Sequence, residues 1–251
     1  MDTVLGKAIA VLRAFSADDH ELSLSALVER TGLPKTSVHR IAGDLVHHRL
    51  LDRTSHGYRL SGGLFELGMR ASLERGLAEL SMPFLQDLYE RTHEIVHLGL
   101  REGHEVVYVA KITGRRQARS PSRAGGRMPL YCTAIGKVLL AWSDEEVRRA
   151  VLTRPMPPLT AHTITAPGRV ARQLDTALSA GVAFEREESA LGIQCVAAPV
   201  LDLDNKLVAA ISVTGPVGRF RPEQHADAVR AAAHGLGALV ARRTSLRPDP
   251  S

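Results

Sequence analysis

The sequence has little cysteine, no long apolar run and little net charge. Its two cysteines in 251 residues, Cys132 and Cys195, exclude a disulfide framework or a CxxC pair, so a reducing cytoplasm is the expected compartment. No apolar run reaches the roughly 18–20 residues that a membrane-spanning helix needs. The first 20 residues contain an apolar run broken by Lys7 and Arg13, which indicates an amphipathic helix and not a signal peptide. We therefore expect a soluble cytoplasmic protein with no membrane partner.

The net charge is only +5, from 32 Lys and Arg against 27 Asp and Glu. An excess of this size favours anionic partners, but only slightly, because many proteins carry as much positive charge on an ordinary solvated surface. Apolar residues make up 44% and charged residues 24%, as in ordinary globular proteins. The length allows one large domain or two smaller ones, each with its own core.

Residues 1–61 predict three helices followed by a two-stranded wing. Apolar residues recur at helical spacing over 4–16. Ser23 suits the N-cap of a second helix, and Pro34 suits the first turn of a third helix after a short break. The segment 51–60 alternates apolar and polar residues around a His-Gly turn, as in a β-hairpin. This order is typical of a winged helix-turn-helix domain that binds DNA.

In a helix-turn-helix the second helix of the motif lies in the major groove, and its first residues reach base edges. Arg40 can form two hydrogen bonds to guanine, and Lys35 can pair with phosphate or guanine. The predicted DNA-binding residues on this helix and on the wing are Lys35, Thr36, Ser37, His39, Arg40, Arg53 and Arg59. A solvated helix face is the alternative, because residues 1–61 carry eight bases and seven acids, a net charge of +1.

The pattern changes after residues 62–80, which predict a single connecting helix. Beyond them, β-branched runs joined by short turns predict hairpins, and helical segments lie between these runs. The expected fold of residues 81–245 is an α+β domain with a mostly antiparallel sheet. Residues 246–251 are expected to be a disordered tail.

Three long segments, in this order, resemble the IclR family of bacterial transcription regulators. They are LSALVERTGLPKTSVHRIAGDLVHHRLLDR in the first domain, GGRMPLYCTAIGKVLLAW at 125–142 and GVAFEREESALGIQCVAAPVLDLDNKLVAAISVTGP at 181–216. The resemblance implies a winged helix-turn-helix joined by a helix to a GAF-like effector-binding domain. It also implies homodimers or homotetramers without a cofactor, acting as repressor or activator. These would bind palindromic operator DNA and respond to a small metabolite.

The resemblance also implies an effector pocket. By position, its lining residues are Met128, Ala134, Ile135, Glu185, Cys195, Ser212 and Thr214. Ser212 and Thr214 are two residues apart and so face the same side of a strand. An apolar pocket with a few hydroxyls and a thiol suits a small polar organic ligand. The alternatives are backbone hydrogen bonds for the two hydroxyls and an inert buried thiol for Cys195. Where some relatives have alanine, Ile135 is bulkier, so we expect a tighter pocket.

A basic run lies just before this region. Residues 111–127 contain no acid and six bases, namely Lys111, Arg115, Arg116, Arg119, Arg123 and Arg127. The run is either a solvated loop or a cover over the pocket that attracts a carboxylate or a phosphate ester. Under the second alternative the effector is anionic, and Arg116 and Arg119 contribute to its affinity.

The segment His93-Glu94-Ile95-Val96-His97 matches the H-E-x-x-H signature of zinc metalloproteases. That site needs both histidines on one helical turn, about 6 Å apart along the axis, whereas Ile95 and Val96 begin an alternating run. Four residues along a strand span about 13 Å, too far for one ion. We therefore predict that this match is a coincidence and that a helix gives way to a strand at this segment. We expect no metal site here and do not expect the protein to be an enzyme. The alternatives are a thiol enzyme using Cys132 or Cys195, and a sensor that does not bind DNA.

Overall fold

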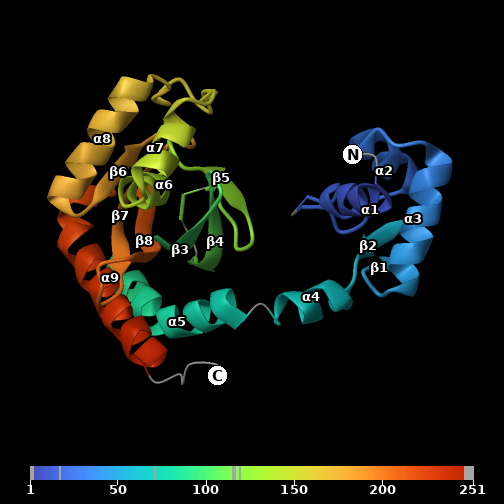
Figure 1. The fold of residues 1–251 in the computed structure, drawn as a ribbon, viewed down its shortest axis with the longest axis horizontal. Helices are drawn as coiled ribbons and strands as arrows, with labels where there is room; N and C mark the ends of the chain where they lie inside the picture. The colour runs from blue at the N-terminus through green and yellow to red at the C-terminus, as the bar shows by residue number, and fades with distance from the viewer. Residues whose placement is uncertain (1–2, 17, 71, 115–116, 119, 246–251) are drawn as a thin grey trace. The chain divides into compact units, whose positions relative to one another are not determined.

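The computed structural model divides the chain into two compact units, Met1–Arg75 and Gly76–Ser251. The structure describes residues 3–16, 18–70, 72–114, 117–118 and 120–245 (Figure 1). The predicted tail at 246–251 and three bases of the predicted loop, Arg115, Arg116 and Arg119, lie outside these ranges. Among the described residues, every helix is too short or too polar to cross a bilayer.

The first unit consists of helices around one small core, with a hairpin at its side. Its elements are α1 (Val4–Arg13), α2 (Leu24–Thr31), α3 (Lys35–His47), β1 (Leu51–Arg53), β2 (Tyr58–Leu60) and α4 (Gly62–Gly68). The strands β1 and β2 are antiparallel, with Leu51 opposite Leu60. Val11, Leu27 and Val38, one from each of the first three helices, are fully buried against one another. The predicted three helices and wing are therefore confirmed.

Local sequence sets the ends of these helices. Ser23 is the N-cap of α2, and its hydroxyl accepts a hydrogen bond from the Ala26 N–H at 3.2 Å. Gly32 ends α2 with φ at 66°, a left-handed conformation that costs glycine little. Pro34 is the N-cap of α3 and makes no side-chain cap hydrogen bond. The turn between α2 and α3 therefore follows from the Thr-Gly-Leu-Pro sequence.

The second unit is built on one six-stranded sheet in the order β5-β4-β3-β8-β7-β6, with every neighbouring pair antiparallel. Its elements are α5 (Ser72–Thr92), β3 (Ile95–Glu102), β4 (Glu105–Ile112), β5 (Arg127–Pro129), α6 (Ala134–Ala141), α7 (Glu145–Leu152), α8 (Pro167–Ala180), β6 (Ala183–Arg186), β7 (Ile193–Leu201), β8 (Leu207–Pro216) and α9 (Pro222–Ser245). The predicted α+β fold is confirmed.

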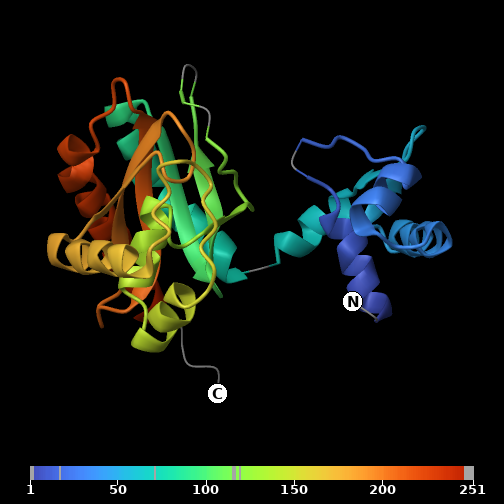
Figure 2. The same cartoon turned by 90° about the horizontal axis from the view of Figure 1, so that it is seen from above.

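Helices cover both faces of the sheet, so this unit has two cores (Figure 1 and Figure 2). The helices α5 and α9 pack on the face that carries Leu98, Val196 and Ile211. The helices α6, α7 and α8 pack on the other face. Because side chains alternate along a strand, His97 and Ser212 point to the α6 side, where the candidate pocket lies.

The structure differs from the predicted single helix over 62–80. The helix α4 ends at Gly68, and α5 begins at Ser72 and continues to Thr92, past the expected boundary at 80. Glycine has low helix propensity, which explains the early end of α4. Pro83 lies inside α5, where it removes one backbone hydrogen bond without ending the helix. The three-residue strand β5 was not predicted, because it is too short to show an alternating pattern.

The H-E-x-x-H segment is not helical. The helix α5 ends at Thr92, His93 follows with φ at 52°, and β3 begins at Ile95. His97 therefore lies on a strand, and the prediction of a helix end running into a strand is confirmed.

Candidate functional site

The first candidate site is the start of α3. Lys35, Thr36, His39 and Arg40 are exposed there and Ser37 is half-buried, while the opposite side of the helix is held in the core by Val38, Ile41, Ala42 and Leu45. Because no side chain caps α3, its first backbone N–H groups remain available to a phosphate. The structure thus brings the five predicted residues of this helix to one solvent-facing end.

The two predicted wing residues are also exposed, on adjacent strands. The Arg59 guanidinium pairs with Asp52 at 3.0 Å, and Arg53 lies over the ring of Tyr58 at 5.7 Å. On α3, Arg40 pairs with Asp44 at 3.7 Å. These pairs are solvent-exposed and weak, so a DNA phosphate or base can replace either acid.

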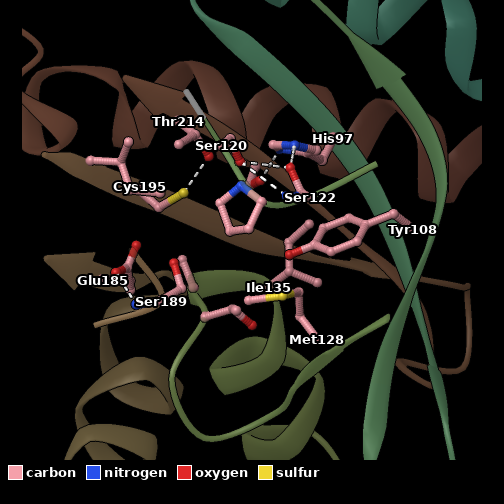
Figure 3. Close-up of a pocket in the computed structure, with 15 residues that line it drawn as sticks. His97, Tyr108, Ser120, Ser122, Met128, Ile135, Glu185, Ser189, Cys195 and Thr214 are labelled. Atoms are coloured by element: carbon pink, nitrogen blue, oxygen red, sulfur yellow. Dashed lines mark hydrogen bonds between the residues drawn. The ribbon is translucent and has the colours of Figure 1, made fainter. Parts of the chain in front are cut away.

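The second candidate site is a pocket between the sheet and α6. All seven residues predicted for the effector site line it: Met128 on β5, Ala134 and Ile135 on α6, Glu185 on β6, Cys195 on β7, and Ser212 and Thr214 on β8 (Figure 3). Residues that sequence reasoning did not assign to it are His97, Tyr108, Ser120, Pro121, Ser122, Thr133, Ser189 and Ile193. For His97, alternation with the apolar Val96 and Leu98 was an available signal.

The pocket is tight. The space open to the centres of water-sized molecules is about 20 Å³, enough for one or two waters. Ile135 fills part of it and lies against Gly99, where a Cβ atom would stand 2.8 Å from the Ile135 Cγ2 atom. The bulk of Ile135 is thus accommodated by the missing side chain of Gly99. Thr133 caps α6, accepting from the Gly136 N–H at 3.0 Å.

Glu185 is the only acidic side chain among the lining residues, and it is buried. Its Oε1 atom accepts hydrogen bonds from the backbone N–H groups of Glu188 at 2.5 Å and Ser189 at 2.9 Å. Its Oε2 atom is buried and has no partner among the described residues. Burial raises the pKa of Glu185 to about 7, although the two backbone hydrogen bonds oppose this shift. Near neutral pH this carboxyl can therefore act as donor or acceptor.

The two hydroxyls on β8 bond side chains of the pocket and not the backbone. Thr214 forms a hydrogen bond with the Cys195 thiol, and the Ser212 hydroxyl lies 3.3 Å from Nδ1 of His97 (Figure 3). Burial raises the pKa of the Cys195 thiol and brings that of Cys132 to about 12. Both thiols are therefore protonated at neutral pH, which disfavours thiolate chemistry.

His97 is buried in the pocket with both ring nitrogens occupied. Its Nε2 atom is 2.6 Å from the Ser122 hydroxyl, and its ring lies 5.1 Å from that of Tyr108. Burial lowers the pKa of His97 to about 3, with a further contribution from the nearby Lys111 ammonium. The imidazole is therefore neutral. Within the described ranges, no group of three or more His, Cys, Asp or Glu side chains is arranged to hold a metal.

Next to the pocket, the ammonium of Lys137 is buried and pairs with Glu188. The Lys137 Nζ atom also lies 3.4 Å from the carbonyl oxygen of Phe184. Because Glu188 is three residues from Glu185 and donates its N–H to it, this ion pair fixes the turn that carries the pocket's carboxyl group.

A winged helix-turn-helix in one unit and an enclosed polar pocket in the other define a DNA-binding regulator with a sensing domain. The chain belongs to the IclR family of transcription regulators. Residues 4–55 match the IclR helix-turn-helix domain, and residues 70–238 match the bacterial transcriptional regulator IclR C-terminal domain. It is thus a transcription regulator with a DNA-binding domain and a C-terminal ligand-binding domain.

Similar proteins agree with this assignment. The HTH-type transcriptional regulator KdgR of Escherichia coli is 33% identical over 221 residues, which is 87% of this chain and 84% of that protein. The transcriptional repressor IclR of the same organism is 25% identical over 88% of this chain and 82% of its own length. An IclR homolog of Microbacterium hydrocarbonoxydans, solved in complex with 4-hydroxybenzoate, has a TM-score of 0.88 at 27% identity, covering 96% of this chain and all of that one.

Proposed function

We propose that operator binding by this chain is controlled by a small polar organic molecule bound in the pocket of Figure 3. One observation carries the proposal: seven residues from five separate helices and strands line one pocket, and one of them, Glu185, has a buried oxygen without a partner among the described residues. A hydroxyl on the ligand would supply the missing hydrogen bond. The homolog bound to 4-hydroxybenzoate supports a ligand of this kind.

We propose that the DNA partner is a palindromic operator bound by a homodimer, alone or paired into a tetramer. Apolar side chains on α1 and α4 are exposed in the single chain, with Leu5 and Phe65 each 70% exposed and Val4 63%. Burial of such side chains against a second copy would remove apolar surface from water. In the complex, the residues at the start of α3 contact bases and phosphates, and Arg53 and Arg59 follow the backbone.

The control mechanism we propose is a population shift. Ligand binding in the sensing domain (81–245) favours one placement of the two DNA-binding domains (1–61) through the connecting segment (62–80), which changes their fit to two half-sites. Repression is favoured because the relative IclR is a repressor. Such a regulator acts in the cytoplasm, where chromosomal DNA is accessible.

The test combines thermal shift and gel shift. Candidate metabolites, including 4-hydroxybenzoate, are screened by thermal unfolding, where a ligand at 100 times its Kd stabilises by about 2.7 kcal/mol. Each hit is then added to a gel shift with the intergenic DNA upstream of the chain's own gene. We expect the hit to change DNA binding by the wild type but to have a much weaker effect on Thr214→Val.

The matched control is Thr176→Val, at an exposed position on α8 outside the pocket, which should respond as the wild type does. Absence of DNA binding with and without every compound would overturn the regulator proposal. Equal responses of Thr214→Val and Thr176→Val would overturn the assignment of the pocket.

A further inference from the structure

The segment Ser120–Ser122 lines the pocket and is held there by side-chain hydrogen bonds. The Ser122 hydroxyl lies 2.6 Å from Nε2 of His97 and 2.7 Å from the Ser120 hydroxyl (Figure 3). The Ser122 carbonyl accepts from Nζ of Lys111 at 2.5 Å. Across the described residues, no backbone–backbone hydrogen bond ties 120–122 to the sheet. The contact with His97 and Lys111 therefore anchors this segment.

The two residues that bind Ser122 are built into the sheet as a pair. His97 on β3 and Lys111 on β4 are direct cross-strand partners, so their side chains project from the same face. On its other side His97 is opposite Ser212 of β8, whose hydroxyl can donate to Nδ1 and leave Nε2 as the N–H donor. The pair thus presents one N–H and one ammonium to a common acceptor group.

Ser122 meets this pair with two oxygen atoms, its carbonyl oxygen and its hydroxyl oxygen. A carboxylate also presents two acceptor oxygens and adds the negative charge that an ammonium prefers. The lining residues include no Lys or Arg. Lys111 is the cation that Ser122 contacts directly, whereas Lys137, beside the pocket, is already paired with Glu188. Burial lowers the pKa of Lys111, which means that the ammonium would gain from an anionic partner.

The small volume of the pocket also indicates that Ser122 moves when a ligand binds. A ligand larger than a water or two needs room that the pocket lacks, and most lining residues belong to strands or to the buried helix α6. Ser120–Ser122 lies outside helices and strands and depends on the bonds made by Ser122. Its outward movement would enlarge the pocket and at the same time uncover His97 and Lys111.

We propose that His97 Nε2 and Lys111 Nζ form a carboxylate subsite that Ser122 occupies in this structure, and that an anionic effector binds by replacing Ser122. This inference rests on the proposed effector pocket and names the chemical class of its ligand, a small organic carboxylate. The other ionisable groups that line the pocket with His97 are Tyr108 on β4, Glu185 on β6 and Cys195 on β7, and none of them is a cation. Ser122 then acts as an internal competitor, and its release couples ligand binding to movement of residues 120–122.

The test uses acetate as the probe and acetamide as its uncharged counterpart, with the full chain selectively labelled at histidine Cε1. The His97 NMR signal is assigned by its loss in His97→Gln. We expect acetate, and not acetamide, to shift this signal in a saturable way. Ser122→Ala removes the competing hydroxyl and should bind acetate about fivefold more tightly. Lys111→Met should bind acetate about tenfold more weakly because the ammonium is lost.

The matched control is Ser179→Ala, which removes an exposed hydroxyl on α8 outside the pocket and should titrate as the wild type does. No shift with acetate, an equal shift with acetamide, or unchanged affinity in Ser122→Ala or Lys111→Met overturns the inference. If compounds control DNA binding through the pocket while Lys111→Met binds acetate as the wild type does, the carboxylate subsite is wrong but the proposed function stands. If acetate binds as expected but no compound affects DNA binding, the proposed function fails instead.

Discussion

The two candidate sites differ in how the chain builds them. The candidate DNA-binding surface is one exposed end of α3 with a neighbouring hairpin, so it is nearly continuous in sequence, from residue 35 to 59. The candidate effector pocket is buried and takes residues from positions 97 to 214, on β3 to β8, on α6 and in loops between them. Charges at the first site are screened by water, whereas ionisable groups at the second site are desolvated and interact more strongly with one another. The same substitution should therefore have different consequences in the two units.

The largest expected contrast concerns loss of one cation. Lys137→Met leaves the buried Glu188 carboxylate without its partner and should lower the free energy of unfolding by about 3–5 kcal/mol, measured by urea denaturation. Arg40→Met breaks an exposed pair in the first unit and should cost less than about 1 kcal/mol. The double variant Lys137→Met with Glu188→Gln should recover much of the loss. Equal costs at the two positions would contradict the comparison.

The second contrast is in pH dependence. The pKa of Glu185 is about 7 in the folded protein and near 4.5 in the unfolded chain, so the folded state holds a proton that the unfolded state releases between these values. This stabilising contribution is complete below pH 4.5 and is lost as the pH rises through 7. At pH 8, Glu185→Gln should therefore be more stable than the wild type by about 2–3 kcal/mol, relative to the difference at pH 4.

Urea midpoints at pH 4 and pH 8 measure this difference. The matched control is Glu187→Gln, at a neighbouring residue that does not line the pocket and should not change the pH dependence in this way. A parallel pH dependence of Glu185→Gln and the wild type would show that folding leaves the pKa of the Glu185 carboxyl unchanged and would contradict the prediction.

At the exposed site, the effect of a substitution should appear in DNA binding and not in stability. Arg40→Ala should weaken operator binding by about 10–100-fold, because a bidentate contact to a base is worth about 1–3 kcal/mol. Arg40→Lys keeps the charge without the planar fork and should recover only part of the loss. Fluorescence anisotropy at fixed salt, with operator and unrelated DNA, measures both. An equal loss on unrelated DNA would identify a phosphate contact instead.

The smallest expected effect tests the turn that places α3. Gly32 has φ at 66° with open space around its Cα, so Gly32→Ala should destabilise the protein through backbone strain alone, by about 1 kcal/mol. Gly43 lies in α3, also in open space but without a positive φ, so Gly43→Ala should stabilise by about 0.5–1 kcal/mol. Thermal unfolding of the two variants should give shifts of opposite sign.

Sequence reasoning was most successful where structure is local. Ser23, Gly32 and Pro34 act within a few residues, and the helices and wing they delimit appear as predicted. The continuous α5 was missed because the predicted connecting helix ended at residue 80. In the structure α5 continues through Pro83, and packing of Leu85 and Leu88 on the sheet outweighs one lost backbone hydrogen bond. All seven predicted pocket residues lie together, but they came from a family resemblance and not from a local pattern.

The sequence by itself determined the two kinds of domain, the strand identity of the H-E-x-x-H segment and the residues at the start of α3, because turns, caps and periodicity act over short distances. Only the tertiary structure decided that His97 stands opposite Lys111 and Ser212 and that Ser122 forms hydrogen bonds with both His97 and Lys111. It also decided that the Glu185 carboxyl is buried away from water. Those facts depend on strand register and burial, which join residues far apart in the chain and which no short stretch of sequence encodes.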